Sequence, residues 1–122
     1  MDKENIIVKK SKAFAIRIIR MYQWLTKEKK EFVLSKQCLR SGTSIGANIA
    51  ECIKGQSTSD FIAKLYISLK EANETAYWLD LLKETDYIDH KTFESINEDC
   101  EELIKLITSI IKTTKNNNNI KN

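Results

Sequence analysis

Apolar side chains recur along this chain every three or four residues, which is the spacing of an amphipathic helix. Four such segments follow one another, over Lys9–Lys27, Phe32–Gly55, Asp60–Glu84 and from Asp89 onward. Short polar connections between them favour antiparallel neighbours, and the 3-4 spacing favours crossing angles of about 20°. The pattern therefore predicts an all-α fold, an antiparallel up-down-up-down four-helix bundle.

Each predicted helix contributes one apolar stripe to the expected core. The stripes consist of Phe14, Ile18, Met21 and Leu25, then Leu34, Cys38, Gly42, Ile45, Ile49 and Cys52, then Ile62, Leu65, Leu69, Ala72, Ala76 and Leu79, and finally Phe93, Ile96, Cys100, Leu103, Ile107, Ile110 and Thr114.

The third helix carries further apolar residues outside its stripe, among them Tyr66, Tyr77 and Trp78. A helix that is apolar around most of its circumference has more than one face to bury. Since aromatic residues are enriched in interface cores, we expect these three at a contact with another protein chain. A wide core stripe is the alternative.

The predicted helix ends depend on residues that favour turns and caps. Gly55 suits a left-handed end of the second helix, because glycine adopts that conformation at little cost. Ser57, Thr58 or Ser59 can cap the third helix, and Asp89 the fourth. We expect one domain over residues 1–115 and a frayed, asparagine-rich tail over residues 116–122.

Two glycines lie one turn apart within the second predicted helix. Gly42 and Gly46 each cost a helix interior about 1 kcal/mol relative to alanine. Together with Ala50 they form a small-residue surface that allows another helix to approach closely, inside the bundle or between subunits. A phosphate-binding loop is disfavoured, because its glycines precede a helix and these lie within one.

Composition agrees with a helical globular domain. The 122 residues include no proline, three glycines and three cysteines, with 42% hydrophobic and 30% charged residues. No apolar run approaches the roughly 20 residues of a membrane span, and the N-terminus lacks the pattern of a signal peptide. We therefore expect a cytoplasmic protein without membrane contact, whose cysteines are reduced and buried.

The net charge of +3 conceals an uneven distribution. Residues 1–60 hold 12 Lys and Arg against 6 Asp and Glu, whereas residues 61–122 hold 8 against 11. Such a polarity can steer a polyanion, or match the basic face of one subunit to the acidic face of another.

Four basic residues of the first two helices are candidates for a nucleic-acid contact. Arg17 and Arg20 are three residues apart, and Lys36 and Arg40 are four apart. The two pairs can merge into one basic strip, or they can instead pair with acids such as Glu98, Asp99, Glu101 and Glu102. Because no aromatic residue suited to base stacking is interleaved with them, we expect contacts to the RNA backbone without sequence specificity.

No residue set in the chain fits catalysis or a cofactor. The only histidine, His90, lies beside Asp89 at a helix start. A di-iron bundle needs Glu-x-x-His on two helices, and a nucleophile needs a base. A carboxylate pair would require Glu51 and Glu74 to face each other. We therefore predict a protein without catalytic residues, metal or cofactor.

Three motifs resemble those of a known family. They are RSGTSIGANIAE over Arg40–Glu51, SDFIAKL over Ser59–Leu65 and KEANETAYWL over Lys70–Leu79. They are similar to motifs of a small bacterial four-helix-bundle family, often encoded by intervening sequences in 23S ribosomal RNA genes. Cys52 departs from that pattern, in which a small residue usually follows the glutamate.

The resemblance implies a non-enzymatic bundle that assembles as a ring-like homopentamer. A related branch is the accessory variability determinant of diversity-generating retroelements, a basic pentameric barrel that binds nucleic acid and a reverse transcriptase. The expected function is thus a homo-oligomeric assembly protein with a basic surface for RNA. The alternative is an interaction scaffold that binds a protein such as a polymerase or reverse transcriptase without contacting nucleic acid.

Overall fold

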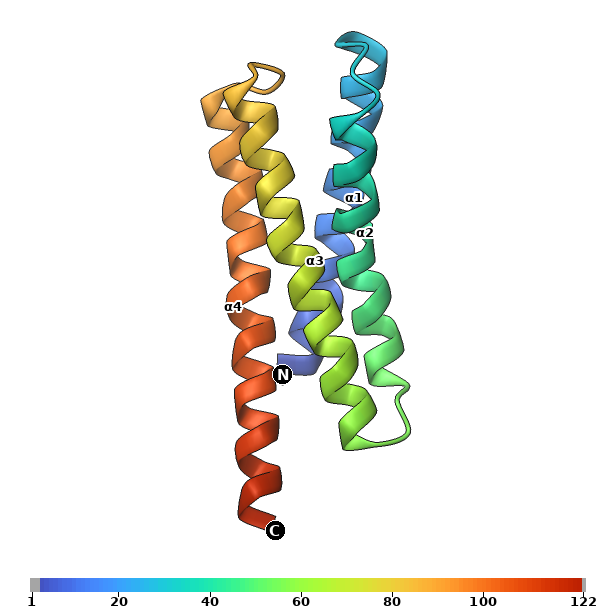
Figure 1. The fold of residues 1–122 in the computed structure, drawn as a ribbon, viewed down its shortest axis with the longest axis vertical. Coiled ribbons are helices and arrows are strands. Elements are labelled where there is room, and N and C mark those ends of the chain that lie inside the picture. Colours follow the sequence, from blue (N-terminus) through green and yellow to red (C-terminus); the bar gives the residue numbers. More distant parts are fainter. Residues whose placement is uncertain (1–2, 122) are drawn as a thin grey trace.

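Four antiparallel helices make up the part of the protein that the structure describes (Figure 1). The computed structural model describes the backbone of residues 3–121 and the side chains of residues 4–118. The helices are α1 (Lys3–Glu28), α2 (Leu34–Ile53), α3 (Thr58–Glu84) and α4 (His90–Lys121). No helix within residues 3–121 combines the length and the apolarity needed to cross a membrane.

The helices pack in a closed cycle, as the predicted all-α four-helix bundle requires. Each helix contacts the next one along the chain, and α4 contacts α1. Over residues 3–121 the diagonal pairs, α1 with α3 and α2 with α4, make no close backbone contact. Figure 1 shows α1 beside α2 and α3 beside α4. The helices directly beside α1 are therefore α2 and α4, while α3 lies diagonally across the bundle.

The apolar stripes predicted from the sequence form the core. All four stripe residues of α1 are buried, and so are most of those on the other helices. Ile7 joins them because α1 begins at Lys3, about one and two-thirds turns before the expected start at Lys9.

Small hydroxyl side chains line the contact between α2 and α3, which the apolar pattern did not indicate. Ser41, Ser68 and Thr75 are fully buried. Ser68 Oγ donates to the carbonyl oxygen of Ile45 at 2.9 Å, and Thr75 Oγ1 donates to Ser41 Oγ at 2.8 Å. Since each hydroxyl has a partner, the two helices approach closely without leaving a buried polar group unsatisfied.

A buried carboxylate begins α2. Glu31 accepts hydrogen bonds from the backbone N–H groups of Val33, Leu34 and Ser35 at 3.1, 3.0 and 2.7 Å. Burial alone would raise the pKa of this carboxyl, but the hydrogen bonds from Ser35, Leu34 and Val33 outweigh it and hold the pKa below its usual value. Glu31 thus supplies the cap of α2, a role that the sequence did not indicate.

The predicted caps of α3 and α4 are confirmed. Ser57 Oγ accepts from the N–H of Asp60 at 3.1 Å, and Asp89 Oδ1 accepts from the N–H of Thr92 at 2.7 Å.

The prediction for Gly55 is wrong, because no glycine within residues 3–121 has a positive φ. Left-handed turns occur instead at Lys30 (φ 54°) and Asp86 (φ 66°), directly after α1 and α3.

The C-terminal helix extends farther than expected. We predicted a frayed tail from residue 116, whereas α4 continues to Lys121. Nothing in the run of asparagines forbids a helix, since asparagine has a modest propensity and neither proline nor glycine interrupts it. Figure 1 shows these last turns extending past the end of the other helices.

Candidate interaction surfaces

Gly42 and Gly46 bring α1 against the backbone of α2. A Cβ atom added to Gly42 would lie 2.9 Å from both Cγ1 and Cγ2 of Ile18. One added to Gly46 would lie 3.3 Å from the backbone carbonyl oxygen of Ser11. The expected close approach of helices at this pair is therefore present inside the bundle.

An open apolar groove runs over the outer side of the same contact. Its volume is about 230 Å³, and Gly46 forms part of its floor together with the exposed Ala47 and Ala50. We call it the α1–α2 groove; its lining consists of Val8, Ser11, Lys12, Ala15, Thr43, Gly46, Ala47, Ile49 and Ala50.

The outer side of α3 presents large apolar side chains to solvent. Tyr66, Ile67 and Tyr77 are 44%, 42% and 57% exposed, and we call these three the α3 outer face. Trp78 is half-buried beside it, with its ring 5.3 Å from that of Tyr77 in an edge-on contact and its Nε1 donating to Glu74. Of the two alternatives for these aromatics, a wide core stripe does not apply to Tyr66 and Tyr77.

The four predicted basic residues do not form one strip. Arg17 faces α4, where its guanidinium pairs with Asp99 at 2.8 Å. Arg40 faces α3 and pairs with Glu71 at 3.2 Å and with Glu74. Because α1 and α3 are diagonal in the bundle, these two arginines lie on different sides of the α1–α2 pair. The prediction of a merged strip is therefore wrong, and acid pairing describes both arginines better.

A different set of cations remains free of acidic partners on α1. Lys9, Lys12, Arg20 and Lys27 are exposed and make no ion pair with any side chain described here. Their spacing keeps them within about 80° of one another around the helix. Between residues 5 and 27 the chain contains no acid at all. We call these four the α1 basic face; Lys36, on α2, is also exposed.

One tryptophan lies among the arginines, which corrects the expectation that no aromatic residue accompanies them. Arg17, Arg20 and Trp24 all line one hollow between α1 and α4. Their spacings of three and four residues already place them on one side of a helix, a signal that was available in the sequence.

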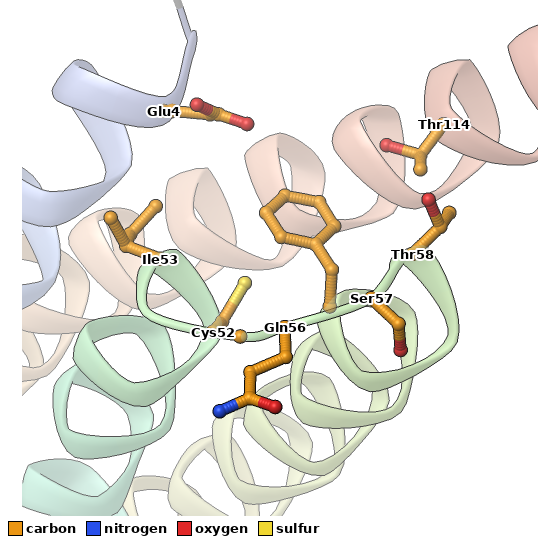
Figure 2. A pocket seen from close by; sticks show the side chains of 9 residues that line it. Glu4, Cys52, Ile53, Gln56, Ser57, Thr58 and Thr114 are labelled. Atoms are coloured by element: carbon orange, nitrogen blue, oxygen red, sulfur yellow. The ribbon is translucent and has the colours of Figure 1, made fainter.

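A further hollow lies at the α2–α3 connection (Figure 2). Its volume is about 440 Å³, and Glu4, Cys52, Ser57 and Thr114 contribute polar atoms. Burial raises the pKa of Cys52 to about 11, and the negative charge of Glu4 adds to this effect. The thiol is therefore protonated near neutral pH and is a poor nucleophile.

The other candidate reactive side chains do not line this hollow. His90 is exposed at the start of α4, with its Nε2 2.9 Å from Glu94. Cys38 and Cys100 are free and buried, and burial raises the pKa of each to about 12. The candidate carboxylates are separated, since Glu51 pairs with Lys64 and Glu74 with Arg40.

The model of the 23S rRNA-intervening sequence protein family matches residues 3–109, most of the chain. The chain belongs to this family. The resemblance seen in the three sequence motifs is thereby confirmed.

A solved structure of a relative agrees with the fold of this 23S rRNA-intervening sequence protein. It is a protein of unknown function from the S23 ribosomal protein family of Bacteroides thetaiotaomicron, 58% identical in sequence, with a TM-score of 0.90. The match covers 91% of this chain and 99% of the relative. No curated protein matches the chain.

Proposed function

We propose that this family member is a non-enzymatic assembly protein, a ring-like homopentamer whose α1 basic face contacts RNA. The observation that carries the proposal is the α3 outer face, where Tyr66, Ile67 and Tyr77 stay largely exposed although Lys115 lies over the Tyr66 ring and Trp78 touches the Tyr77 ring. Exposed apolar groups gathered on one helix typically mark an interface. The family resemblance favours five copies.

A closed ring needs two different surfaces on each subunit, because its contacts are head-to-tail. The chain offers such a pair. The α3 outer face projects bulky side chains, whereas the α1–α2 groove is lined by small ones such as Ala47 and Ala50. Charge supports the pairing, since the α1–α2 half is basic and the α3–α4 half acidic.

The assembly is tested with one variant on each surface. Tyr77→Glu and Ala47→Glu each place a charge in one of the two proposed contact surfaces, so each should yield monomers in light scattering. Mixed together they should form 1:1 dimers, because the Ala47→Glu chain keeps its α3 face and the Tyr77→Glu chain keeps its groove. Thr113→Glu, at an exposed position of α4, should leave the assembly intact.

Two outcomes would refute this assembly. One is a wild-type protein that stays monomeric at micromolar concentration. The other is a mixture of the two variants that remains monomeric, because a head-to-tail contact must be restored between complementary chains.

The α1 basic face supports the RNA contact. Lys9, Lys12, Arg20 and Lys27 hold no acid in the described chain and are free to meet phosphates. Binding through phosphates is strongest at low salt and weakens steeply as salt rises. A Lys9→Glu, Lys27→Glu double variant leaves the groove residue Lys12 unchanged and should therefore lose binding to labelled RNA, whereas Lys105→Glu on α4 should keep most of it. Absence of binding by the wild type at low ionic strength would end the RNA part of the proposal.

The groups available for chemistry support a non-enzymatic role. The Cys52 thiol in the hollow at the α2–α3 connection has a raised pKa, and the one histidine lies at the start of α4. General base and nucleophile are thus not brought together.

The second candidate is a scaffold for another protein such as a polymerase. The same α3 outer face favours it, because a foreign helix could cover Tyr66 and Tyr77 as well as a second copy could. A wild-type monomer that binds no RNA would leave this candidate in place.

A further inference from the structure

An open hollow lies between α1 and α4, near the C-terminal end of α1. Its volume is about 300 Å³, at the small end of the range for ligand pockets. Four side chains of α1 and two of α4 line it: Arg17, Arg20, Met21, Trp24, Thr92 and Ile96. None of these six is acidic, so the hollow combines an apolar lining with positive charge.

One wall of the hollow is held in place by α4. Arg17 donates to the carbonyl oxygen of Ser95 at 3.1 Å, to Ser95 Oγ at 2.7 Å and to Asp99 Oδ2 at 2.8 Å. These bonds occupy its guanidinium, so Arg17 contributes mainly its aliphatic stem to the lining. Met21 and Ile96 are buried behind it. The hollow is therefore built on fixed side chains.

Trp24 supplies an accessible aromatic surface at this hollow. Its side chain is 43% exposed, although a tryptophan gains much from burial. Lys29 Nζ lies 5.4 Å from the centroid of the Trp24 ring, because the electron-rich face of the ring attracts a cation. Lys29 is not among the lining residues, and a ligand in the hollow need not displace it.

Arg20 supplies a charge that the protein does not neutralise. Its guanidinium donates to Gln23 Oε1 at 3.4 Å and makes no ion pair with any described residue. Arg20 also belongs to the α1 basic face, so the hollow lies directly beside the cations proposed to meet RNA phosphates.

We propose that this hollow binds an unpaired base of single-stranded RNA, with the base stacked on Trp24 and a neighbouring phosphate on Arg20. The inference rests on the proposed RNA contact and adds the class of strand. An aromatic ring next to an arginine without an acidic partner suits a nucleotide, because the base can stack on the ring and the phosphate can pair with the guanidinium. Duplex RNA does not offer this, because its bases are already stacked on one another, whereas single strands are recognised by stacking on aromatic side chains.

The test uses the intrinsic fluorescence of Trp24. The chain has two tryptophans, so Trp78→Phe leaves Trp24 as the only one. A short uridine-rich strand added at low salt should quench this fluorescence, and quenching should saturate together with the anisotropy of the labelled RNA. The same strand annealed to its complement should bind through phosphates with little quenching.

Two variants at the same position give the matched comparison. Trp24→Ala should weaken single-strand binding about 5- to 150-fold, the range for loss of one base–aromatic stack. Its affinity for the duplex should stay unchanged. Trp24→Phe keeps an aromatic ring and should restore most of the single-strand affinity.

The outcomes separate this inference from the function on which it rests. If RNA binds but Trp24 fluorescence does not respond and Trp24→Ala binds the single strand as tightly, the stacking site is refuted and the phosphate contact stands. If no RNA binds at low salt, the stacking site and the phosphate contact are both refuted. If Trp24 fluorescence responds to protein concentration but not to RNA, another copy of the chain occupies the hollow and the inference is overturned.

Discussion

At the scale of single residues, the missing side chain of Gly42 determines how closely α1 and α2 approach. Gly42→Ala should lower the free energy of unfolding by about 1–3 kcal/mol, the usual cost of overpacking a core. This loss of stability is expected although alanine has a helix propensity about 1 kcal/mol more favourable than that of glycine. The reason is the 2.9 Å distance to Cγ1 and Cγ2 of Ile18, both buried and unable to yield easily. Urea denaturation followed by circular dichroism measures the difference.

A double-mutant cycle tests whether Ile18 is the cause. Ile18→Ala removes both clashing atoms and leaves a cavity, which costs stability on its own. In that background Gly42→Ala should be neutral or stabilising. An equal loss in both backgrounds would show that Ile18 is not responsible.

Glu31 makes the stability of α2 depend on pH. Because its pKa is lowered in the folded protein, its contribution is present above the unfolded value of about 4.5 and is lost as pH falls through the folded pKa. Glu31→Gln should therefore cost about 1–2 kcal/mol at pH 6, in the range for a lost helix cap. The difference from wild type should shrink at pH 3.

The matched control for Glu31 is Glu28→Gln, three residues earlier and exposed. It should change the free energy of unfolding little at either pH. A Glu31→Gln protein as stable as wild type at pH 6 would refute the capping role.

Residue roles of this kind were only partly predictable. The caps at Ser57 and Asp89 were visible because a side chain bonds to a backbone N–H three residues on, a local geometry. Glu31 was missed because it caps from outside the helix, after a left-handed turn at Lys30. The place of Trp24 beside the arginines was not predicted, because the basic residues were grouped by charge alone and Trp24 is an uncharged residue on the same side of α1.

At the scale of elements, the ends of α1 and α3 depend on left-handed residues that are not glycine. Asp86 N–H bonds to Lys83 O at 3.0 Å and Tyr87 N–H to Leu82 O at 2.9 Å, closing α3 around the positive φ of Asp86. This arrangement usually carries glycine, since other residues pay about 1–2 kcal/mol for the conformation.

Asp86→Gly should thus raise the free energy of unfolding by about 1 kcal/mol and the midpoint of thermal unfolding with it. The neighbouring Thr85 has a φ of −99°, so Thr85→Gly should instead lower stability. Equal destabilisation by both changes would show that the turn gains nothing from glycine.

The helices themselves were predictable because burial on one side of a helix leaves a repeat of three and four residues. That repeat identified the core stripes and the order of packing. The close contact between α2 and α3 was harder to predict. Ser41, Ser68 and Thr75 are polar residues typical of a surface, and their burial depends on hydrogen bonds across the contact.

At the scale of the whole molecule, charge could not be placed from the sequence alone. Arg17 and Arg40 seemed neighbours because their helices are neighbours, but each turns to a different adjoining helix and meets an acid there. Which side of a helix a long cation takes depends on partners far along the chain, such as Asp99 for Arg17. The α1 basic face is what remains after that pairing.

The central claim is that the α3 outer face closes a ring of identical subunits. Native mass spectrometry of the wild-type protein at micromolar concentration tests it most directly, because the subunit number is read as a ratio of masses. We predict a species of about five times the 14.1 kDa chain, persisting on dilution through the micromolar range. A protein found only at the mass of the single chain would contradict the account.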